Sequence, residues 1–387
     1  MESLNPKVLG YHTSHNASVA LVEDGKVSWG IEEERVSRRK HDQVPALAIT
    51  NYLNDNVDVA LHSTLVHPDQ IENHNYVMNV CQSLIKKATS KQIQPKKTIY
   101  VDDQGEMSGW FKRPPEPEFV DCSENHHLYH AALGFYNSGF EEAAVLVVDG
   151  AGAWVDKSGH EVETIYKASY PCNFEKISQS AAPWHTLIDD HEIESPAYGI
   201  GFVYSAVSAF LGFGTLECGT LMGLSTYGEE DSNIKPLVVD GKIDETLFTR
   251  YVHGIKLNPY PYIEDREGWC DIVNKKSTDL SEHKHLVNLA WRCQKDFETY
   301  MTNKIKEALK VSNNIVLTGG CALNCVANYE YLKHLPKDAK LYVEPNSTDA
   351  GISMGMAMYC WRDITKSTEI FPLKNLYLGP ADNEILY

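Results

Sequence analysis

Apolar and polar residues alternate near the start of the chain in a pattern typical of short β-strands. The segment "KVLGYHTSHNASVALVEDGKVSWGIEEE" (7–34) has an apolar run, a polar loop, a second run, a turn and a third run. The turn residues Glu23, Asp24 and Gly25 separate two alternating runs, which is the signature of a β-hairpin. The segment therefore predicts a three-stranded meander.

A second segment repeats this plan. In "AAVLVVDGAGAWVDKSGHEVETIYKAS" (143–169), a buried strand ends at Asp149, a glycine loop follows, and two more strands flank the turn "DKSGH". Helical patterns follow each meander, so the repeat predicts a duplicated α/β fold with two lobes and a cleft between them.

The remaining elements follow from the same periodicities. From Cys293 onward, Phe297, Met301 and Ile305 recur every four residues and predict an amphipathic helix. The segment from about 229 to 280 is polar and rich in turn residues, so it is expected to be irregular. Strands are expected at 57–63, 97–103 and 313–320, helices at 44–56, 75–88, 126–136, 199–214 and 321–335, and a strand, loop and helix within 339–361.

Composition and charge narrow the class of protein. The chain has 387 residues, of which 43% are hydrophobic and 23% charged, as in ordinary soluble domains. It contains no apolar run near the ~20 residues of a membrane span, and its start lacks the layout of a signal peptide, so a cytoplasmic protein is expected. A net charge of −18 disfavours binding to polymeric DNA or RNA, although the basic segment 35–41 could hold one phosphate group.

The cysteines do not indicate a metal or disulfide framework. Their number, nine, is odd, and no zinc-ribbon CxxC pair occurs. Cys321 and Cys325 are four apart and would share a face of a helix, and both are expected to be small buried apolar residues.

Three histidines occur within five positions in "HHLYH" (126–130). On a helix, His126 and His130 face the same way, which is the geometry of paired metal ligands, whereas His127 points about 100° away. An isolated pair of this kind more often packs or caps a helix.

Two carboxylates strengthen the metal interpretation. Asp149 ends a buried strand, where an unpaired carboxylate would be costly, and Asp349 precedes a helix in the analogous place near the other end of the chain. Two imidazoles and two carboxylates suit a divalent transition metal such as iron, manganese or zinc.

Other motifs leave alternatives open. In "TGGCALN", Gly319 and Gly320 form a strand-to-helix turn that either binds a nucleotide through its N–H groups or simply packs. The glycine-rich segment 212–228 reads as a binding loop or a flexible connection. Lys40 and His15 are candidates for recognising an anion or assisting proton transfer, and the charged run 32–42 is otherwise a solvated face.

Together these motifs resemble the O-carbamoyltransferase family, which includes nodulation-factor, cephalosporin and tobramycin carbamoyltransferases. The matching stretches occur in the family's order and cover most of residues 7 to 380. They are "SHNASVALVEDGKV", "EEERVSRRKHD", "HHLYHAALGFYNSGFEEAAVLVVDGAG", "MGLSTYG", "TGGCALNCVANYEYL" and "EPNSTDAGISMGMAMY".

The resemblance implies a fold and a chemistry. The family's N-terminal domain is similar to the tRNA threonylcarbamoyltransferase, with two ribonuclease-H-like lobes of the actin-like ATPase superfamily. Family members make carbamoyl adenylate from carbamoyl phosphate and ATP, then pass the carbamoyl group to a hydroxyl. The implied metal is iron, its implied ligands are His126, His130, Asp149 and Asp349, the implied adenylate site is Gly319, Gly320 and Asn324, and the implied catalytic residues are His15 and Lys40.

The resemblance also sets domain expectations and shows two departures. The N-terminal domain is expected to span 1–372, with lobe one at about 1–135 plus a helix at about 350–365 and lobe two at about 136–349, and residues 373–387 are expected to start a linker to a C-terminal domain. The family's C-terminal adenylate-forming domain would begin at "LGPADNEILY"; either the chain is truncated, a separate protein supplies carbamoyl adenylate, or the second activity is absent. Where the family shows Gly-Lys before "MGL", this chain has Gly219, Thr220 and Leu221, so the phosphate contact of that lysine does not carry over to this chain.

Two rival functions stay open at this stage. A nucleotide-binding ATPase or sugar-kinase-like protein would explain two lobes and "TGG" but not the histidine pair, and a non-catalytic subunit would explain the missing domain. The acceptor of a carbamoyl group could be a sugar, an antibiotic or a hydroxymethylated nucleobase, and the acidic charge favours a small molecule.

Overall fold

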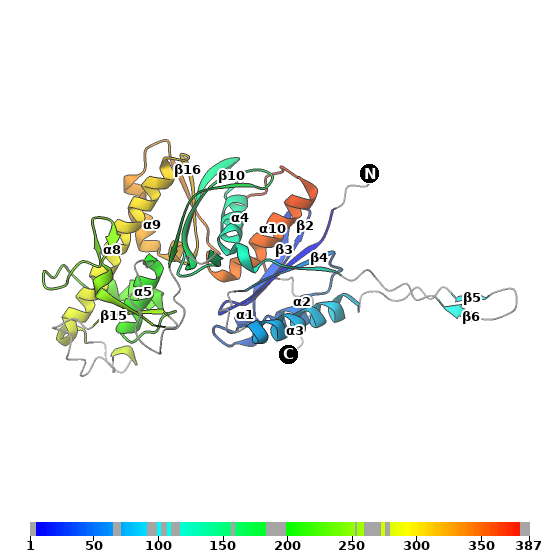
Figure 1. Cartoon of the computed structure of the whole chain (residues 1–387), viewed down its shortest axis with the longest axis horizontal. Helices are drawn as coiled ribbons and strands as arrows, with labels where there is room; N and C mark the ends of the chain where they lie inside the picture. The colour runs from blue at the N-terminus through cyan, green and yellow to red at the C-terminus, as the bar shows by residue number, and fades with distance from the viewer. Residues whose placement is uncertain are drawn as a thin grey trace. The chain divides into compact units, whose positions relative to one another are not determined.

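The computed structural model describes residues 5–64, 71–90, 99–101, 107–109, 117–155, 159–182, 199–251, 254–258, 272–274 and 279–379. The chain divides into two compact units (Figure 1). The first unit comprises 1–136 and 348–387, and the second comprises 137–347. Each unit contains one main sheet with helices.

The first unit is built on a five-stranded sheet in the order β3-β2-β1-β4-β7. Strand β1 is antiparallel to β2 and parallel to β4, β2 is antiparallel to β3, and β4 is parallel to β7. The hairpin between β2 and β3 turns at Asp24 and Gly25, both with positive φ, as the sequence predicts. The strands are β1 Val8–Thr13, β2 Ser18–Glu23, β3 Lys26–Glu32, β4 Val59–Thr64 and β7 Glu118–Asp121.

Helices of the first unit cover both faces of this sheet (Figure 1). Because side chains alternate along a strand, Leu9 and Tyr11 point into a core shared with α2 and α3. Gly10 and His12 lie on the opposite face, against which α10 packs. The helices are α1 Glu33–Ser37, α2 Ala46–Tyr52, α3 Ile71–Ser90, α4 His126–Ser138 and α10 Ile352–Thr365. The last two residues of α4 belong to the second unit. Strands β5 Ile99–Val101 and β6 Met107–Gly109 form a separate antiparallel pair.

The second unit repeats the same strand order. Its sheet runs β11-β10-β8-β16-β17, with the short strand β9 paired to β10. Strands β8, β10 and β11 are successively antiparallel, and β16 is parallel to both β8 and β17. The strands are β8 Glu142–Val148, β9 Trp154–Val155, β10 Gly159–Ser169, β11 Asn173–Ala182, β16 Asn314–Thr318 and β17 Lys340–Val343.

The two sheets therefore match strand for strand in order and direction. This match confirms the expectation of two ribonuclease-H-like lobes. The three strands expected within 143–169 are present as β8, β9 and β10, but their places in the sheet differ from the prediction. The short β9 lies off the main path of the sheet, β10 is the middle strand of the meander, and its third strand is β11, which lies beyond residue 169. Strand β11 is a mostly exposed edge strand with a polar sequence, so it has no apolar alternation to reveal it. Most of the predicted turn "DKSGH" lies outside the described residues.

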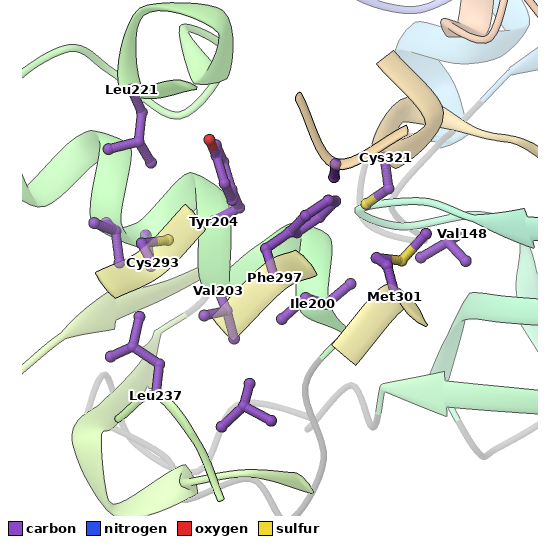
Figure 2. Close-up of a cluster of buried hydrophobic side chains, with 14 of the residues drawn as sticks. Val148, Ile200, Val203, Tyr204, Leu221, Leu237, Cys293, Phe297, Met301 and Cys321 are labelled. Atoms are coloured by element: carbon purple, nitrogen blue, oxygen red, sulfur yellow. The ribbon is translucent and has the colours of Figure 1, made fainter. Parts of the chain in front are cut away.

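A large apolar core joins the sheet of the second unit to its helices (Figure 2). Tyr204 of α5 meets Phe297 of α8 edge to face, with ring centroids 5.2 Å apart. Met301 continues the buried face of α8, as the period of four predicts. The helices are α5 Ile200–Phe210, α6 Cys218–Ser225, α8 Lys284–Leu309 and α9 Cys325–Tyr331.

The segment expected to be irregular contains two short hairpins among its described residues. They are β12 Val238–Val239 with β13 Lys242–Ile243, and β14 Phe248–Tyr251 with β15 Gly254–Leu257. Within the ranges that the structure describes, no helix combines the length and apolarity that crossing a membrane requires.

The predicted pairing of Cys321 with Cys325 on one helix is wrong. Cys321 lies in a 3-10 turn at Gly320–Leu323, and Asn324 then caps α9, which begins at Cys325. The change of backbone conformation at Asn324 separates the two environments, so Cys321 is buried whereas Cys325 is exposed.

Candidate functional site

Helix α4 carries the histidine pair of the first unit. His126 and His130 are both fully buried, and their rings meet edge to face with centroids 4.8 Å apart. One helical turn separates them, which is why their rings lie on the same side of α4. His127 is also buried, and its ring centroid is 6.2 Å from that of His126.

Asp349 reaches these histidines from the other end of the chain. It begins the 3-10 turn Asp349–Gly351, which leads directly into α10. Its Oδ1 atom is 3.5 Å from Nε2 of His126 and 3.7 Å from Nε2 of His130. The boundary of the units falls at residue 348, so Asp349 belongs to the first unit with both histidines.

Two glycines allow α10 to lie close enough for this arrangement. A Cβ atom at Gly10 of β1 would overlap the carbonyl oxygen of Ser353, and one at Gly355 would overlap the carbonyl oxygen of Tyr129 in α4. Backbone therefore packs against backbone on both sides of α10, which brings Asp349 at its N-terminal end to the histidines of α4.

The surroundings of Asp349 favour its ionised form. Burial alone would raise the pKa of this carboxyl, but the charge of His126 and the nearby imidazoles of His12 and His130 hold its pKa well below the ordinary range. Burial also lowers the pKa of His12, against the opposing effect of Asp349. The site therefore offers an ionised carboxylate beside buried imidazoles.

The second oxygen of Asp349 is contacted by the loop between β1 and β2. Ser14 donates a hydrogen bond to Oδ2 at 3.3 Å, and Nε2 of His12 and Nδ1 of His15 each lie 3.8 Å from it. His12 and Ser14 were not among the predicted site residues. One signal was available for His12: it shares strand parity with Gly10, so it points to the same face.

The donor set of the first unit fits a divalent transition metal. One ligand atom each from His126, His130 and Asp349 lies within 4.8 Å of the others, and all three residues are buried. Two imidazole nitrogens and one carboxylate oxygen form a mixed set of the kind that binds zinc, iron or manganese.

Asp149, the predicted fourth ligand, belongs to the second unit. It directly follows β8, and its Oδ1 accepts hydrogen bonds from the N–H groups of Gly150 at 2.8 Å and Gly320 at 3.2 Å. These bonds tie the carboxylate to the glycine turn of its own unit. Its role as a metal ligand stays a prediction.

Close backbone packing and hydrogen bonds within the protein hold the predicted nucleotide turn in place. Gly319 has φ of 87°, and a Cβ atom there would overlap the carbonyl oxygen of Val148, so only glycine fits. Asn324 accepts from the N–H of Ala327 at 3.0 Å as the cap of α9, and its carboxamide exchanges two hydrogen bonds with Gln294. Asn324 therefore holds the turn in place through bonds within the protein.

The predicted catalytic residues lie in neighbouring loops of the first unit. The side chain of His15 is 37% exposed, and its ring is 6.1 Å from that of His41. Lys40, adjacent to His41, is exposed. In the second unit, Thr220 of α6 is exposed, and Leu221 is buried in the core.

Comparison with known proteins places these features in a family. The sequence model of the family described as "Carbamoyltransferase N-terminus" matches residues 7–358. The uncharacterized protein sll1178 of Synechocystis sp. is 26% identical, over 95% of this chain and 59% of its own length. The nodulation protein NolNO of Sinorhizobium fredii is 24% identical, over 95% of this chain and 49% of its own length.

Among solved structures, full-length HypF in a phosphate- and nucleotide-bound form gives a TM-score of 0.44 at 14% identity, covering 94% of this chain and 56% of HypF. The chain spans about half to three-fifths of the curated relatives' length. Because the family model extends from residue 7 to residue 358, the resemblance found in the sequence is confirmed, and the chain belongs to the carbamoyltransferase family.

Proposed function

We propose that this chain is an O-carbamoyltransferase that moves the carbamoyl group of carbamoyl adenylate to a hydroxyl of a small-molecule acceptor. The observation that carries the proposal is the buried cluster of His126, His130 and Asp349 in a member of the carbamoyltransferase family. An ATPase or sugar kinase of similar fold has no evident use for this cluster.

The proposed cofactor is one divalent metal ion, with Fe²⁺ preferred and Mn²⁺ or Zn²⁺ as alternatives. His126, His130 and Asp349 would hold it, and Asp149 is the proposed fourth ligand. When bound, the ion supplies positive charge that offsets the negative charge developing on the leaving group.

The transfer step requires a base and a charge-stabilising group. The acceptor oxygen forms a bond to the carbamoyl carbon, and the bond from that carbon to the adenylate oxygen breaks, so AMP leaves with the electron pair. His15, partly exposed beside Asp349, is proposed to take the hydroxyl proton. Lys40 is proposed to stabilise the charge on the departing adenylate.

The nucleotide part of the donor is assigned to the glycine turn. A Cβ atom at Gly319 would overlap the carbonyl oxygen of Val148, and one at Gly320 would crowd Oδ1 of Asp149, so the turn consists of backbone alone, as an N–H site for a phosphate requires. Because the carboxamide of Asn324 is engaged within the protein, its proposed part is to position this turn.

The source of the donor is also a proposal. Either this chain makes carbamoyl adenylate from carbamoyl phosphate and ATP, or a separate adenylate-forming protein supplies it. The match covers about half to three-fifths of the relatives' length, and the adenylate-forming step is proposed to belong to the unmatched part of those relatives.

A two-armed transfer assay tests the function. One arm supplies preformed carbamoyl adenylate, and the other supplies carbamoyl phosphate with ATP, each with a panel of sugars, aminoglycosides and hydroxymethylated nucleosides. Mass spectrometry should detect the gain of one carbamoyl group in the first arm. ATP hydrolysis without transfer in either arm would indicate an ATPase, and no turnover with preformed adenylate would indicate a non-catalytic subunit.

A further inference from the structure

We infer that His12 and Ser14 form a hydrogen-bond relay that holds Asp349 as a metal ligand through one oxygen only. The inference concerns the first unit alone and rests on the metal part of the proposed function. It assigns positioning roles to two residues that were not among the predicted site residues.

The relay is defined by two contacts. Nε2 of His12 is 2.8 Å from Oγ of Ser14, and Ser14 donates from Oγ to Oδ2 of Asp349 at 3.3 Å. His12 is fully buried, and Asp349 is 5% exposed. The other carboxylate oxygen, Oδ1, is the one that faces His126 and His130. The two oxygens of Asp349 thus have different partners.

The direction of each proton follows from the chemistry of the groups. Ser14 donates its single hydroxyl proton to Oδ2 of Asp349, so that proton is not available to His12. Oγ of Ser14 then accepts from His12, which requires the proton of neutral His12 to be on Nε2. The structure agrees, because Nδ1 of His12 has no hydrogen-bond partner among the described residues and needs none when it is unprotonated.

This arrangement determines how Asp349 can bind a cation. With Oδ2 engaged by Ser14, only Oδ1 is directed to the space beside the two imidazoles, so binding through both oxygens is disfavoured. Hydrogen bonds from outside the ligand set typically orient such ligands and contribute about 10- to 100-fold in metal affinity. His12 acts indirectly, because it fixes the orientation of the Ser14 hydroxyl.

The first test uses metal-free protein. Nitrogen chemical shifts of isotope-labelled histidine, with His12 assigned by comparison with His12→Gln, should show His12 protonated on Nε2. Ser14→Ala should shift His12 towards a mixture of tautomers, whereas Ser14→Thr, which keeps the hydroxyl, should not. Ser63→Ala is the matched control, because Ser63 is buried beside His12 on β4. A His12 ring protonated on Nδ1 in the wild type would overturn the relay.

The second test measures binding of Co²⁺ by its absorption spectrum. Ser14→Ala should weaken binding by about 10- to 100-fold and change the spectrum, as expected when Asp349 gains freedom to bind through both oxygens. Ser14→Thr and Ser63→Ala should bind as the wild type does. Equal affinity and spectrum in Ser14→Ala would refute the inference and leave the proposed metal site intact, whereas no binding by the wild type would refute both.

Discussion

Gly355 of α10 lies directly against the backbone carbonyl oxygen of Tyr129 in α4. His130 follows Tyr129 along α4, and Asp349 lies just before α10. This contact between backbones is therefore what allows one carboxylate to approach two imidazoles of α4.

Adding a methyl group at this contact should damage both stability and the site. Gly355→Ala is expected to lower the free energy of unfolding by about 1–3 kcal/mol, because the carbonyl of Tyr129 must move. The matched control is Gly223→Ala in α6, where a Cβ atom meets nothing and stability should rise by about 0.5–1 kcal/mol. Urea denaturation measures both, and a Gly355→Ala protein as stable as the wild type would show that the contact is loose.

Metal content should depend on the histidine pair and not on the histidine beside it. The wild type should bind about one divalent ion per chain, and His130→Ala should bind almost none, because one imidazole is lost from a small ligand set. His127→Gln is the control on the same helix and should keep its metal. Elemental analysis after loading with Fe²⁺ provides the measurement, and full occupancy in His130→Ala would disprove the assignment.

The fourth ligand can be tested separately. If Asp149 binds the ion, Asp149→Ala should reduce metal affinity, whereas Glu163→Gln should not. Glu163 is a suitable control because it is a buried carboxylate of the same unit that bonds Tyr300 and Lys304 instead. Equal affinity in both variants would remove Asp149 from the ligand set.

Replacing either predicted catalytic residue should impair carbamoyl transfer from preformed carbamoyl adenylate. His15→Ala should lower turnover with preformed carbamoyl adenylate at least ~10-fold without changing metal content, because general-base assistance is lost. Lys40→Ala should mainly impair the use of carbamoyl adenylate as the carbamoyl donor. Arg39→Ala, which removes a neighbouring exposed cation, is the control. Wild-type transfer rates in both His15→Ala and Lys40→Ala would reject these roles.

A pH-dependent contribution to stability is expected in the second unit. Burial raises the pKa of Asp296 above its ordinary value of 3.8, although a hydrogen bond from the N–H of Leu237 and the charge of Arg292 oppose this. The folded protein therefore binds the proton more tightly than the unfolded chain, so the contribution of Asp296 is largest at acid pH and declines as pH rises through its folded pKa. The free energy of unfolding of the wild type minus that of Asp296→Asn should decrease as the pH rises through the folded pKa of Asp296. An increase of this difference with pH would contradict the raised pKa.

Much of the fold could be predicted because buried strands and helices leave periodic patterns. The hairpin at Asp24 and Gly25 and the buried face of α8 follow directly from such patterns. The edge strand β11 could not be found in this way, because the polar residues of 173–182 carry no alternation. The exposure of Cys325 depends on the cap at Asn324, which interrupts a segment that reads as one helix.

In the candidate site, too, the sequence predicts some features and does not predict others. The spacing of His126 and His130 predicts their shared direction, because four residues make about one helical turn. The contacts of Ser14 and His12 with Asp349 join positions more than 330 residues apart, and only the packing of α10 on β1 creates them. Local sequence carries no information about such a contact.

The most direct test of the central claim is a titration of carbamoyl transfer against metal occupancy. Protein stripped with a chelator would receive increasing Fe²⁺, and AMP release and carbamoylated acceptor would be measured from preformed carbamoyl adenylate. We expect both products to rise together in proportion to bound metal, reaching a plateau at about one ion per chain, with no rise for His130→Ala. Equal transfer by stripped and reloaded protein would contradict the claim that the cluster of His126, His130 and Asp349 is the metal centre of a carbamoyltransferase.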